Sequence, residues 1–227
     1  MTVFQFALKR SLKQLTNIIF LCGIPLLAIF LPTSEFFPLP VGYHFYGILL
    51  FFTSAKLVSV MMEDRVAGIL LRIGVSPVTH LQYLWQNLLA YTLLLMLQSI
   101  IVIVGGLIYG HNLIAPGLLF LIYVVFTITA ISFSLAWFAL FRQKETAMTI
   151  MFGLVMLMFM AGGLFYPAEL MPEMMQRIVV VLPTYWLAEA QWSLANTGQF
   201  QDLVIPLIVL VLFSTVFLLT GSRRTIA

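Results

Sequence analysis

Six long apolar runs divide the chain, and charged or proline-containing stretches separate them. About 20 mostly apolar residues are needed to cross a bilayer, so each run can form one membrane-spanning helix. The runs cover roughly residues 15–31, 41–62, 81–109, 113–141, 146–166 and 203–221. The pattern predicts an all-α, polytopic membrane protein with six transmembrane helices, organised as a single domain over residues 1–227.

The composition excludes most soluble functions. Of the 227 residues, 62% are apolar and 8% are charged, whereas soluble domains carry about 25% charged residues. A water-facing surface cannot be built from this chain, which excludes a soluble enzyme and a conventional nucleic-acid-binding protein. The lone cysteine, Cys22, rules out an intrachain disulfide.

The lysine and arginine count predicts the orientation, because cytoplasmic loops of membrane proteins carry an excess of these residues. With the N-terminus inside, nine of the 11 basic residues fall on the cytoplasmic side. They are Lys9, Arg10, Lys13, Arg65, Arg72, Arg142, Lys144, Arg223 and Arg224. The bias predicts that both termini are cytoplasmic (N-in, C-in), which requires an even number of spans.

The charged segment 63–79, between the second and third runs, differs from a plain loop. Its apolar residues recur at helical spacing, and basic residues and a glycine lie on the opposite face. The stripe consists of Val66, Ile69, Leu70 and Ile73, and the opposite face of Arg65, Gly68 and Arg72. Gly74 is typical of a helix end and Ser76-Pro77 of the next helix start. The pattern predicts a short cytoplasmic amphipathic helix, which either presents a surface to a partner or lies on the lipid interface.

The N-terminal residues predict a second amphipathic helix. Apolar side chains lie at helical spacing, and three basic side chains flank them. The stripe is Phe4, Leu8, Leu12 and Leu15, and the flanking residues are Lys9, Arg10 and Lys13. Such a helix would lie along the anionic cytoplasmic leaflet. The alternative is a basic cluster that only sets the orientation.

The outer stretch 162–196 contains an apolar run, 178–182, that is too short to cross a bilayer. Pro172 precedes this run and Pro183 closes it. We expect re-entrant or interfacial helices between the fifth and sixth spans, which are tolerated at membrane depth when they pack on protein or face water. Tyr185, Trp186 and Trp192 are typical of an interfacial aromatic belt.

Lys56 is the one charged residue within the second run. A lysine at the centre of a span costs about 2.5–3.5 kcal/mol on insertion scales. Lys56 precedes Glu63 by two helical turns, about 10 Å, so its ammonium group can snorkel to the cytoplasmic interface. The alternative is that it lines the inner mouth of a transport path.

Small residues in the third and fourth runs favour close packing of helices. The third run holds Gly106-x-x-x-Gly110, and the fourth holds Thr127, Thr129, Ala130, Ser132, Ser134 and Ala136.

Two of these segments resemble the ABC-2 family of exporter permeases, which belongs to the ATP-binding-cassette superfamily. The family's coupling helix resembles the run Asp64-Arg65-Val66-Ala67-Gly68-Ile69-Leu70, then Arg72-Ile73 and Ser76-Pro77-Val78. Val66 departs from the family, because a second acidic residue is common there. The family's outer segment, with its two short re-entrant helices, resembles Gly163-x-Phe165-x-Pro167, then Pro172 and Pro183-x-Tyr185. The N-terminal amphipathic helix and the topology match as well, so the resemblance covers essentially the whole chain.

The resemblance implies a permease subunit of an ATP-driven exporter in a bacterial plasma membrane. A second permease copy, identical or a paralogue, would supply the other half of the path. Two separate ATPase subunits would bind ATP and Mg, in keeping with the absence of a G-x-x-x-x-G-K-[ST] phosphate loop from this sequence. We therefore expect no catalytic residue, metal site or cofactor in this chain. The residues implied to contact the ATPase are Glu63, Asp64, Arg65, Gly68, Ile69, Arg72, Ile73, Ser76 and Pro77.

The sequence leaves the cargo open. Short outer loops and a path of Phe, Met, Leu and Thr favour an amphipathic or hydrophobic cargo: a drug (hence multidrug resistance), a peptide antibiotic or a lipid-like molecule. A polysaccharide is the alternative within the family.

Other classes of membrane protein fit the sequence less well. A membrane hydrolase would need a nucleophile with a base, or a group of metal ligands. The sequence does not supply one, because His44, His80 and His111 have no acidic neighbour at ligand spacing. A proton-coupled transporter typically keeps carboxylates within the membrane, and here every Asp and Glu lies in or beside an expected loop. A non-ABC channel or a scaffold subunit stays open as an alternative.

Overall fold

The computed structural model describes residues 3–32, 36–66, 80–166 and 170–223, which form helices and, within these ranges, no strand. Short connections join most of the helices. The helices are α1 (Val3–Lys13), α2 (Leu15–Phe30), α3 (Val41–His44), α4 (Tyr46–Val66), α6 (His80–Tyr109), α7 (Pro116–Phe138), α8 (Lys144–Ala161), α9 (Glu173–Val179), α10 (Pro183–Thr197) and α11 (Phe200–Arg223).

Five described helices, α4, α6, α7, α8 and α11, are long and apolar enough to cross a membrane. A sixth span results if α1 and α2, which meet at a bend of 78°, are taken together. With 16 residues, α2 by itself is about 24 Å long, somewhat less than the roughly 30 Å of a hydrocarbon core. The sequence thus predicted every long helix, and the structure supports five or six spans.

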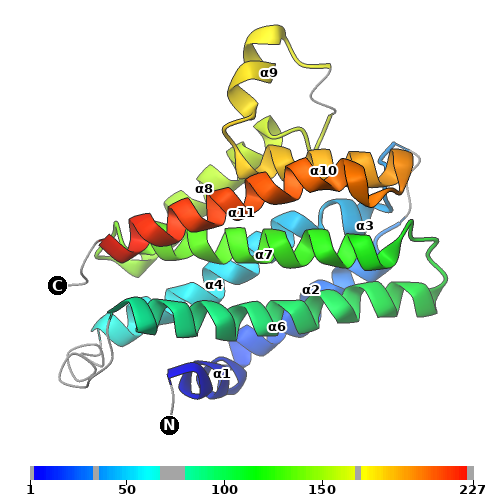
Figure 1. The fold of residues 1–227 in the computed structure, drawn as a ribbon. Helices are drawn as coiled ribbons and strands as arrows, with labels where there is room; N and C mark the ends of the chain where they lie inside the picture. Colours follow the sequence, from blue (N-terminus) through cyan, green and yellow to red (C-terminus); the bar gives the residue numbers. More distant parts are fainter. Residues whose placement is uncertain (1–2, 33–35, 67–79, 167–169, 224–227) are drawn as a thin grey trace.

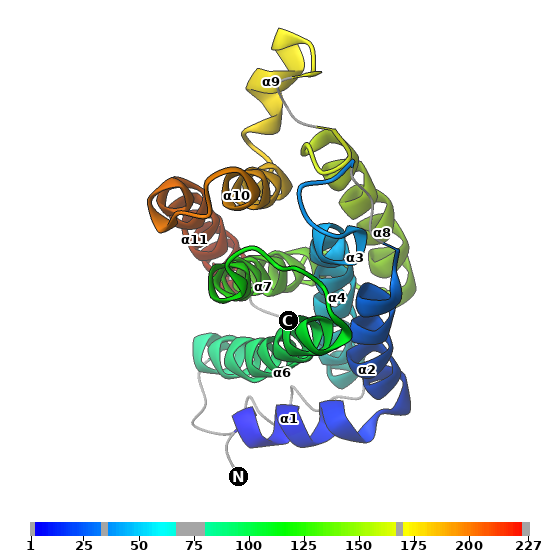
Figure 2. The same cartoon turned by 90° about the vertical axis from the view of Figure 1, so that its right-hand side faces the viewer.

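The long helices run side by side around α7, which lies inside the bundle (Figures 1 and 2). In Figure 2, which looks roughly along the bundle, α6 and α4 flank α7 on two sides, and α10 and α11 lie on a third. α1 lies across the bundle beneath α6, whereas α9 projects away from it. The end of α4, the start of α8 and the end of α11 lie at the left-hand end of the molecule in Figure 1.

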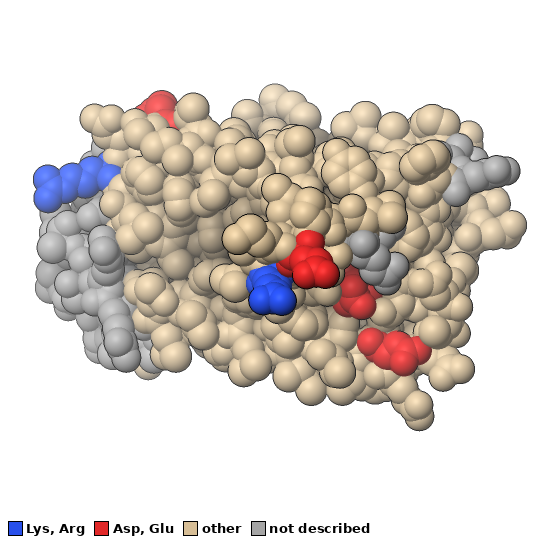
Figure 3. All heavy atoms as spheres, turned by 90° about the horizontal axis from the view of Figure 1, so that it is seen from above, with Lys and Arg blue, Asp and Glu red and all other residues tan. Residues whose placement is uncertain are grey.

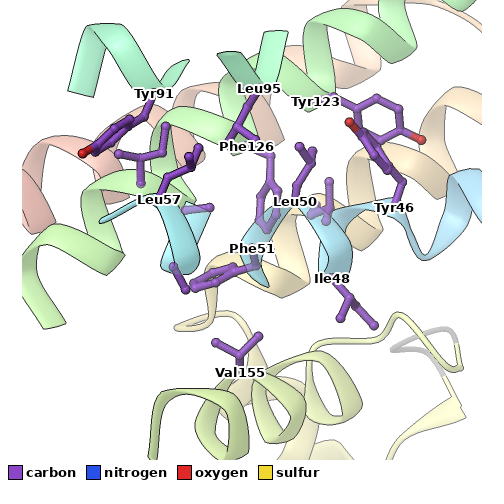
Figure 4. Packing of buried hydrophobic residues seen from close by; sticks show 14 of the residues in the cluster. Tyr46, Ile48, Leu50, Phe51, Leu57, Tyr91, Leu95, Tyr123, Phe126 and Val155 are labelled. Atoms are coloured by element: carbon purple, nitrogen blue, oxygen red, sulfur yellow. The ribbon is translucent and has the colours of Figure 1, made fainter. Parts of the chain in front are cut away.

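Aromatic side chains join α4, α7 and α8 in the core. The rings of Phe51, Phe126 and Phe159 lie with each pair of centroids 6.1 Å apart, and all three are fully buried. Figure 4 shows Phe51 between Phe126 of α7 and Val155 of α8. Such tilted and edge-on ring contacts stabilise the fold by more than the burial of their surface area alone.

Small polar residues on α7 allow its neighbours to approach closely, as the sequence predicted. Thr127, Thr129, Ala130, Ser132 and Ser134 are buried. The Thr129 hydroxyl donates to the Leu210 carbonyl of α11 at 3.0 Å, and the Ser134 hydroxyl lies 3.5 Å from that of Ser54 on α4. These contacts tie α11 and α4 to α7, because an interhelical hydrogen bond is one of the few attractions between helices in lipid.

Gly106, in α6, and Gly110, directly after it, have different roles, and the expectation of a two-glycine packing motif is wrong for Gly110. A Cβ at Gly106 would overlap the Tyr43 hydroxyl, so this glycine does allow close packing. Gly110 has φ +98° and open space around its Cα. The His111 amide donates to the Gly106 carbonyl and the Gly110 amide to that of Leu107, which is the Schellman pattern of a helix end. Gly110 therefore terminates α6.

The N-terminal amphipathic helix is present as α1, and only part of the expected stripe packs: Phe4 and Leu8 are half-buried against the core. Ala7 and Ser11 are the buried side chains of α1, and the Phe4 amide donates to the Gln86 side chain of α6 at 3.1 Å. Leu12 and Leu15, by contrast, are 52% and 71% exposed. Small side chains take the packed positions because α1 lies close against α6, and the leucines at the bend turn outward.

We predict that Gly42→Ala destabilises the protein, whereas Gly153→Ala does not. A Cβ at position 42 would overlap the backbone carbonyl of Ala28 in α2, and such overpacking costs about 1–3 kcal/mol. Gly153, in α8, has open space around its Cα, so alanine there should stabilise by up to about 1 kcal/mol. Thermal unfolding of the two variants in detergent measures the difference. Equal midpoints would contradict the close approach of α3 to α2.

Candidate functional site

A group of polar side chains joins three parts of the bundle where α4 ends. The Lys144 ammonium group pairs with Glu63 Oε1, and the Gln14 side-chain amide donates to Glu63 Oε2 at 3.3 Å. Gln14 Oε1 in turn accepts a hydrogen bond from Asn17 Nδ2 at 3.0 Å. We call these four residues the Glu63 junction. One carboxylate thus links α4, the start of α8 and the bend between α1 and α2.

The local structure explains why Gln14 can reach Glu63. Gln14 lies between α1 and α2 with extended backbone angles, φ −80° and ψ 114°, so the chain turns sharply there. The Asn17 side chain, fully buried in the first turn of α2, holds the Gln14 amide in place. An amide buried in an otherwise apolar helix requires such a partner.

The ion pair positions helices more than it stabilises them. The Lys144 and Glu63 side chains are 24% and 42% exposed, and exposed ion pairs typically contribute about 0.2–1 kcal/mol. Its effect is directional, and two hydrogen bonds to α8 carbonyls, from Trp137 Nε1 to Ala147 and from the Thr184 hydroxyl to Met158, also hold this helix. The junction therefore fixes the start of α8 relative to the end of α4.

Lys56, the candidate for lining a transport path, lies on the same helix as Glu63. Its side chain is half-buried, and its charge acts on the Glu63 carboxylate. Both interpretations of Lys56, a snorkelling side chain and one that lines the inner mouth of a path, stay predictions.

Most of the expected coupling helix lies outside the described residues. Glu63, Asp64 and Arg65 belong to the last turns of α4, which ends at Val66, so the long helix continues into the expected coupling run. The remaining residues of that run, Gly68, Ile69, Arg72, Ile73, Ser76 and Pro77, are not among those described, and their assignment stays a prediction.

At the opposite end of the bundle, the segment after α8 is fixed to α3. Gly163 is buried and has φ +85°, a conformation that side chains other than glycine rarely adopt. It turns the chain so that the Leu164 carbonyl lies 2.6 Å from His44 Nε2. The fully buried His44 ring also stacks on Phe37, with centroids 4.9 Å apart. His44 is thus a structural residue here.

The other residues expected in the outer segment lie at helix ends and ring contacts. Pro172 directly precedes α9, and Pro183 is the buried first residue of α10. Phe165 lies 5.2 Å from the Phe45 ring, and Tyr185 lies 5.2 Å from that of Trp186. Pro167 is outside the described residues. Two helices, α9 and α10, are therefore present in this segment, but the apolar run 178–182 forms the end of α9 and the turn that follows it. The re-entrant position of the two helices stays a prediction.

The α9 segment presents apolar side chains away from the bundle. Leu170, Met174 and Ile178 are 77%, 81% and 66% exposed. Figure 3, which views this side of the molecule, shows a surface that is mostly uncharged, with charged side chains near and to the right of its centre and a few at its left side. A surface of this composition is suited to lipid or to another membrane subunit.

Within the described part of the chain, no group of three or more His, Cys, Asp or Glu side chains could hold a metal ion.

Sequence reasoning missed three members of the Glu63 junction. Lys144 was counted only for orientation, Asn17 was treated as part of an apolar run, and Gln14 was not considered. A buried asparagine in the first turn of a span was the available signal, because it must find a partner. Nothing in the sequence identified that partner.

Two comparisons relate the chain to known proteins. The family model of ABC-2 family transporter proteins matches residues 7–223. The chain is 26% identical over 157 residues to YvfS of Bacillus subtilis (strain 168), which is named as a transport permease. That alignment covers 67% of this chain and 64% of YvfS, so the chain spans slightly less than two thirds of its relative. Because the family match extends over nearly the whole chain, the protein belongs to the ABC-2 family of transporter proteins.

Proposed function

We propose that this chain is the permease subunit of an ATP-driven exporter in a bacterial plasma membrane. Six spans with both termini in the cytoplasm form half of the path, and a second permease copy supplies the other half. Two separate ATPase subunits bind ATP and Mg and act through residues 63–77. Family membership and the five or six candidate spans support this function.

The Glu63 junction is the observation that carries the proposal. Glu63 is the first residue of the expected coupling run, and its carboxylate also contacts Lys144 of α8 and Gln14 at the α1–α2 bend. A force applied to the run by an ATPase would therefore reach α4, α8 and α2 together. Rigid helices joined by such contacts move as units, which is what opening a path between two subunits requires.

An amphipathic or hydrophobic cargo, such as a drug, a peptide antibiotic or a lipid-like molecule, fits the chain best. The described spans expose mainly Leu, Ile, Val, Met and Phe side chains. A path between two such subunits would offer a charged cargo few side chains with which to pair. Apolar groups, by contrast, would enter it at little cost in free energy.

Thiol labelling at two opposite ends of the molecule tests the predicted orientation in the membrane. In a Cys22→Ser background, which removes the exposed native thiol, Gln199→Cys between α10 and α11 should react with a membrane-impermeant maleimide on intact cells. Gln143→Cys before α8 should react only after permeabilisation. Both positions are exposed. Labelling of position 143 from outside would contradict the N-in, C-in arrangement.

We expect Arg65→Glu to weaken association with the ATPase. Reversing a charge at an interface replaces attraction with repulsion, and the effect should shrink as salt is raised. We expect about tenfold less ATPase to co-purify with this variant than with the wild-type protein. Arg142→Glu, which changes an exposed arginine before α8, is the matched control. Full ATPase binding by Arg65→Glu would remove the coupling assignment from this run.

A charge exchange tests the Glu63 junction. Glu63→Lys should place a third positive charge beside Lys144 and Lys56 and reduce transport per ATP hydrolysed several-fold, because like charges repel. The double variant Glu63→Lys with Lys144→Glu should recover most of this coupling. Glu145→Lys, at an exposed neighbouring position, controls for the charge change alone. If the double variant were as uncoupled as the single one, the ion pair would not transmit the motion.

A further inference from the structure

One face of α1 carries a groove lined with basic side chains. Phe6, Lys9, Arg10 and Lys13 follow one another at intervals i, i+3, i+4 and i+7, so they share a face of the helix. Together with Gln14 they are the described residues that line a groove of about 400 Å³. The buried Ala7 and Ser11 are on the other side of the helix, against α6.

The groove combines a carbon-lined floor with charges at its rim. Its lining is almost entirely apolar, because the lysine side chains present their methylene groups to it. Lys9 and Lys13 are exposed, which lets their ammonium groups remain at the edge. Among the described lining residues there is no acidic side chain.

Arg10 is held in place beside the groove. Its Nη2 donates to the Tyr91 hydroxyl of α6 at 3.2 Å, and its guanidinium carbon lies 5.5 Å from the centre of the Phe6 ring. A fixed guanidinium group loses less conformational freedom when it binds an anion than a free side chain would.

The position of α1 favours a lipid over a soluble partner. The bend of 78° between α1 and α2 places α1 near the plane of the membrane surface if α2 follows the membrane normal. Phe6, Leu12 and Leu15 are 42%, 52% and 71% exposed close to the lysines. Alternating apolar and basic exposed side chains are typical of helices that lie at the boundary between headgroups and acyl chains.

We propose that this groove binds one anionic phospholipid. The phosphate group contacts Lys9, Lys13 and the fixed Arg10, and the glycerol and upper acyl carbons lie against Phe6 and the lysine methylene groups. The described residues that would contact the lipid, Phe6, Lys9, Arg10 and Lys13, all belong to α1 and are not members of the Glu63 junction.

The test titrates the purified full-length protein in detergent with short-chain phosphatidylglycerol and counts bound lipid by native mass spectrometry. We expect one phosphatidylglycerol molecule to bind tightly per chain. Phosphatidylcholine, which carries no net charge, should bind at least tenfold more weakly. Lys9→Gln with Lys13→Gln should weaken the tight site about 25-fold, because each lysine near an anionic lipid contributes about fivefold. Lys9→Arg with Lys13→Arg should retain it.

Arg142→Gln is the matched control, because it removes one exposed cation outside the groove and should leave the tight site unchanged. An equal loss in this control would show diffuse attraction and overturn the proposal. Binding of glycerol 3-phosphate as tight as that of phosphatidylglycerol would identify a free-anion site and overturn the lipid assignment. If the double glutamine variant does not fold, the salt dependence of phosphatidylglycerol binding to the wild-type protein provides the test. An affinity of the tight site that does not change with salt would contradict a contact to phosphate.

Discussion

The close approach of neighbouring helices to α7 is the constraint on which the rest of the bundle depends. Lipid chains are as apolar as leucine, so helices in a bilayer associate through close packing and interhelical hydrogen bonds. α7 provides both, because its small hydroxyl side chains are buried and Thr129 donates to a carbonyl of α11. α4, α6, α10 and α11 all contact it, and α8, α2 and α1 pack in turn on these helices.

The two ends of this bundle carry different chemistry. At the end of α4, partly exposed charges link helices through the Glu63 junction, and the basic groove of α1 begins at the same Gln14 side chain. At the other end, neutral rings and carbonyl contacts such as that of His44 with Leu164 fix α3 to the segment after α8. The end of α4 is therefore held by charges in partial contact with water, and the opposite end by buried rings and carbonyls.

Part of the site could be predicted from the sequence because it depends on local pattern. Helical spacing located α1, and a proline at the start of α10 matched its first turn. Glu63 was expected at the end of the second run, and it lies in the last turns of α4. The partners of Glu63 could not be predicted in this way, since Lys144 lies 81 residues further along the chain and only packing brings it near.

The sequence by itself located the long helices, because the thickness of a bilayer imposes a minimum length on each apolar run. The structure set their limits, and divided the run 41–62 into α3 and α4. The tertiary structure decided which faces of these helices touch. It placed Ala7 and Ser11 against α6 and turned Leu12 and Leu15 outward, and it made Gly110 a helix end although its spacing from Gly106 suggested packing. The physical reason is that apolar side chains are suited equally to lipid and to protein. Hydrophobicity therefore fixes what enters the membrane, while side-chain shape and hydrogen bonding select the contacts made there.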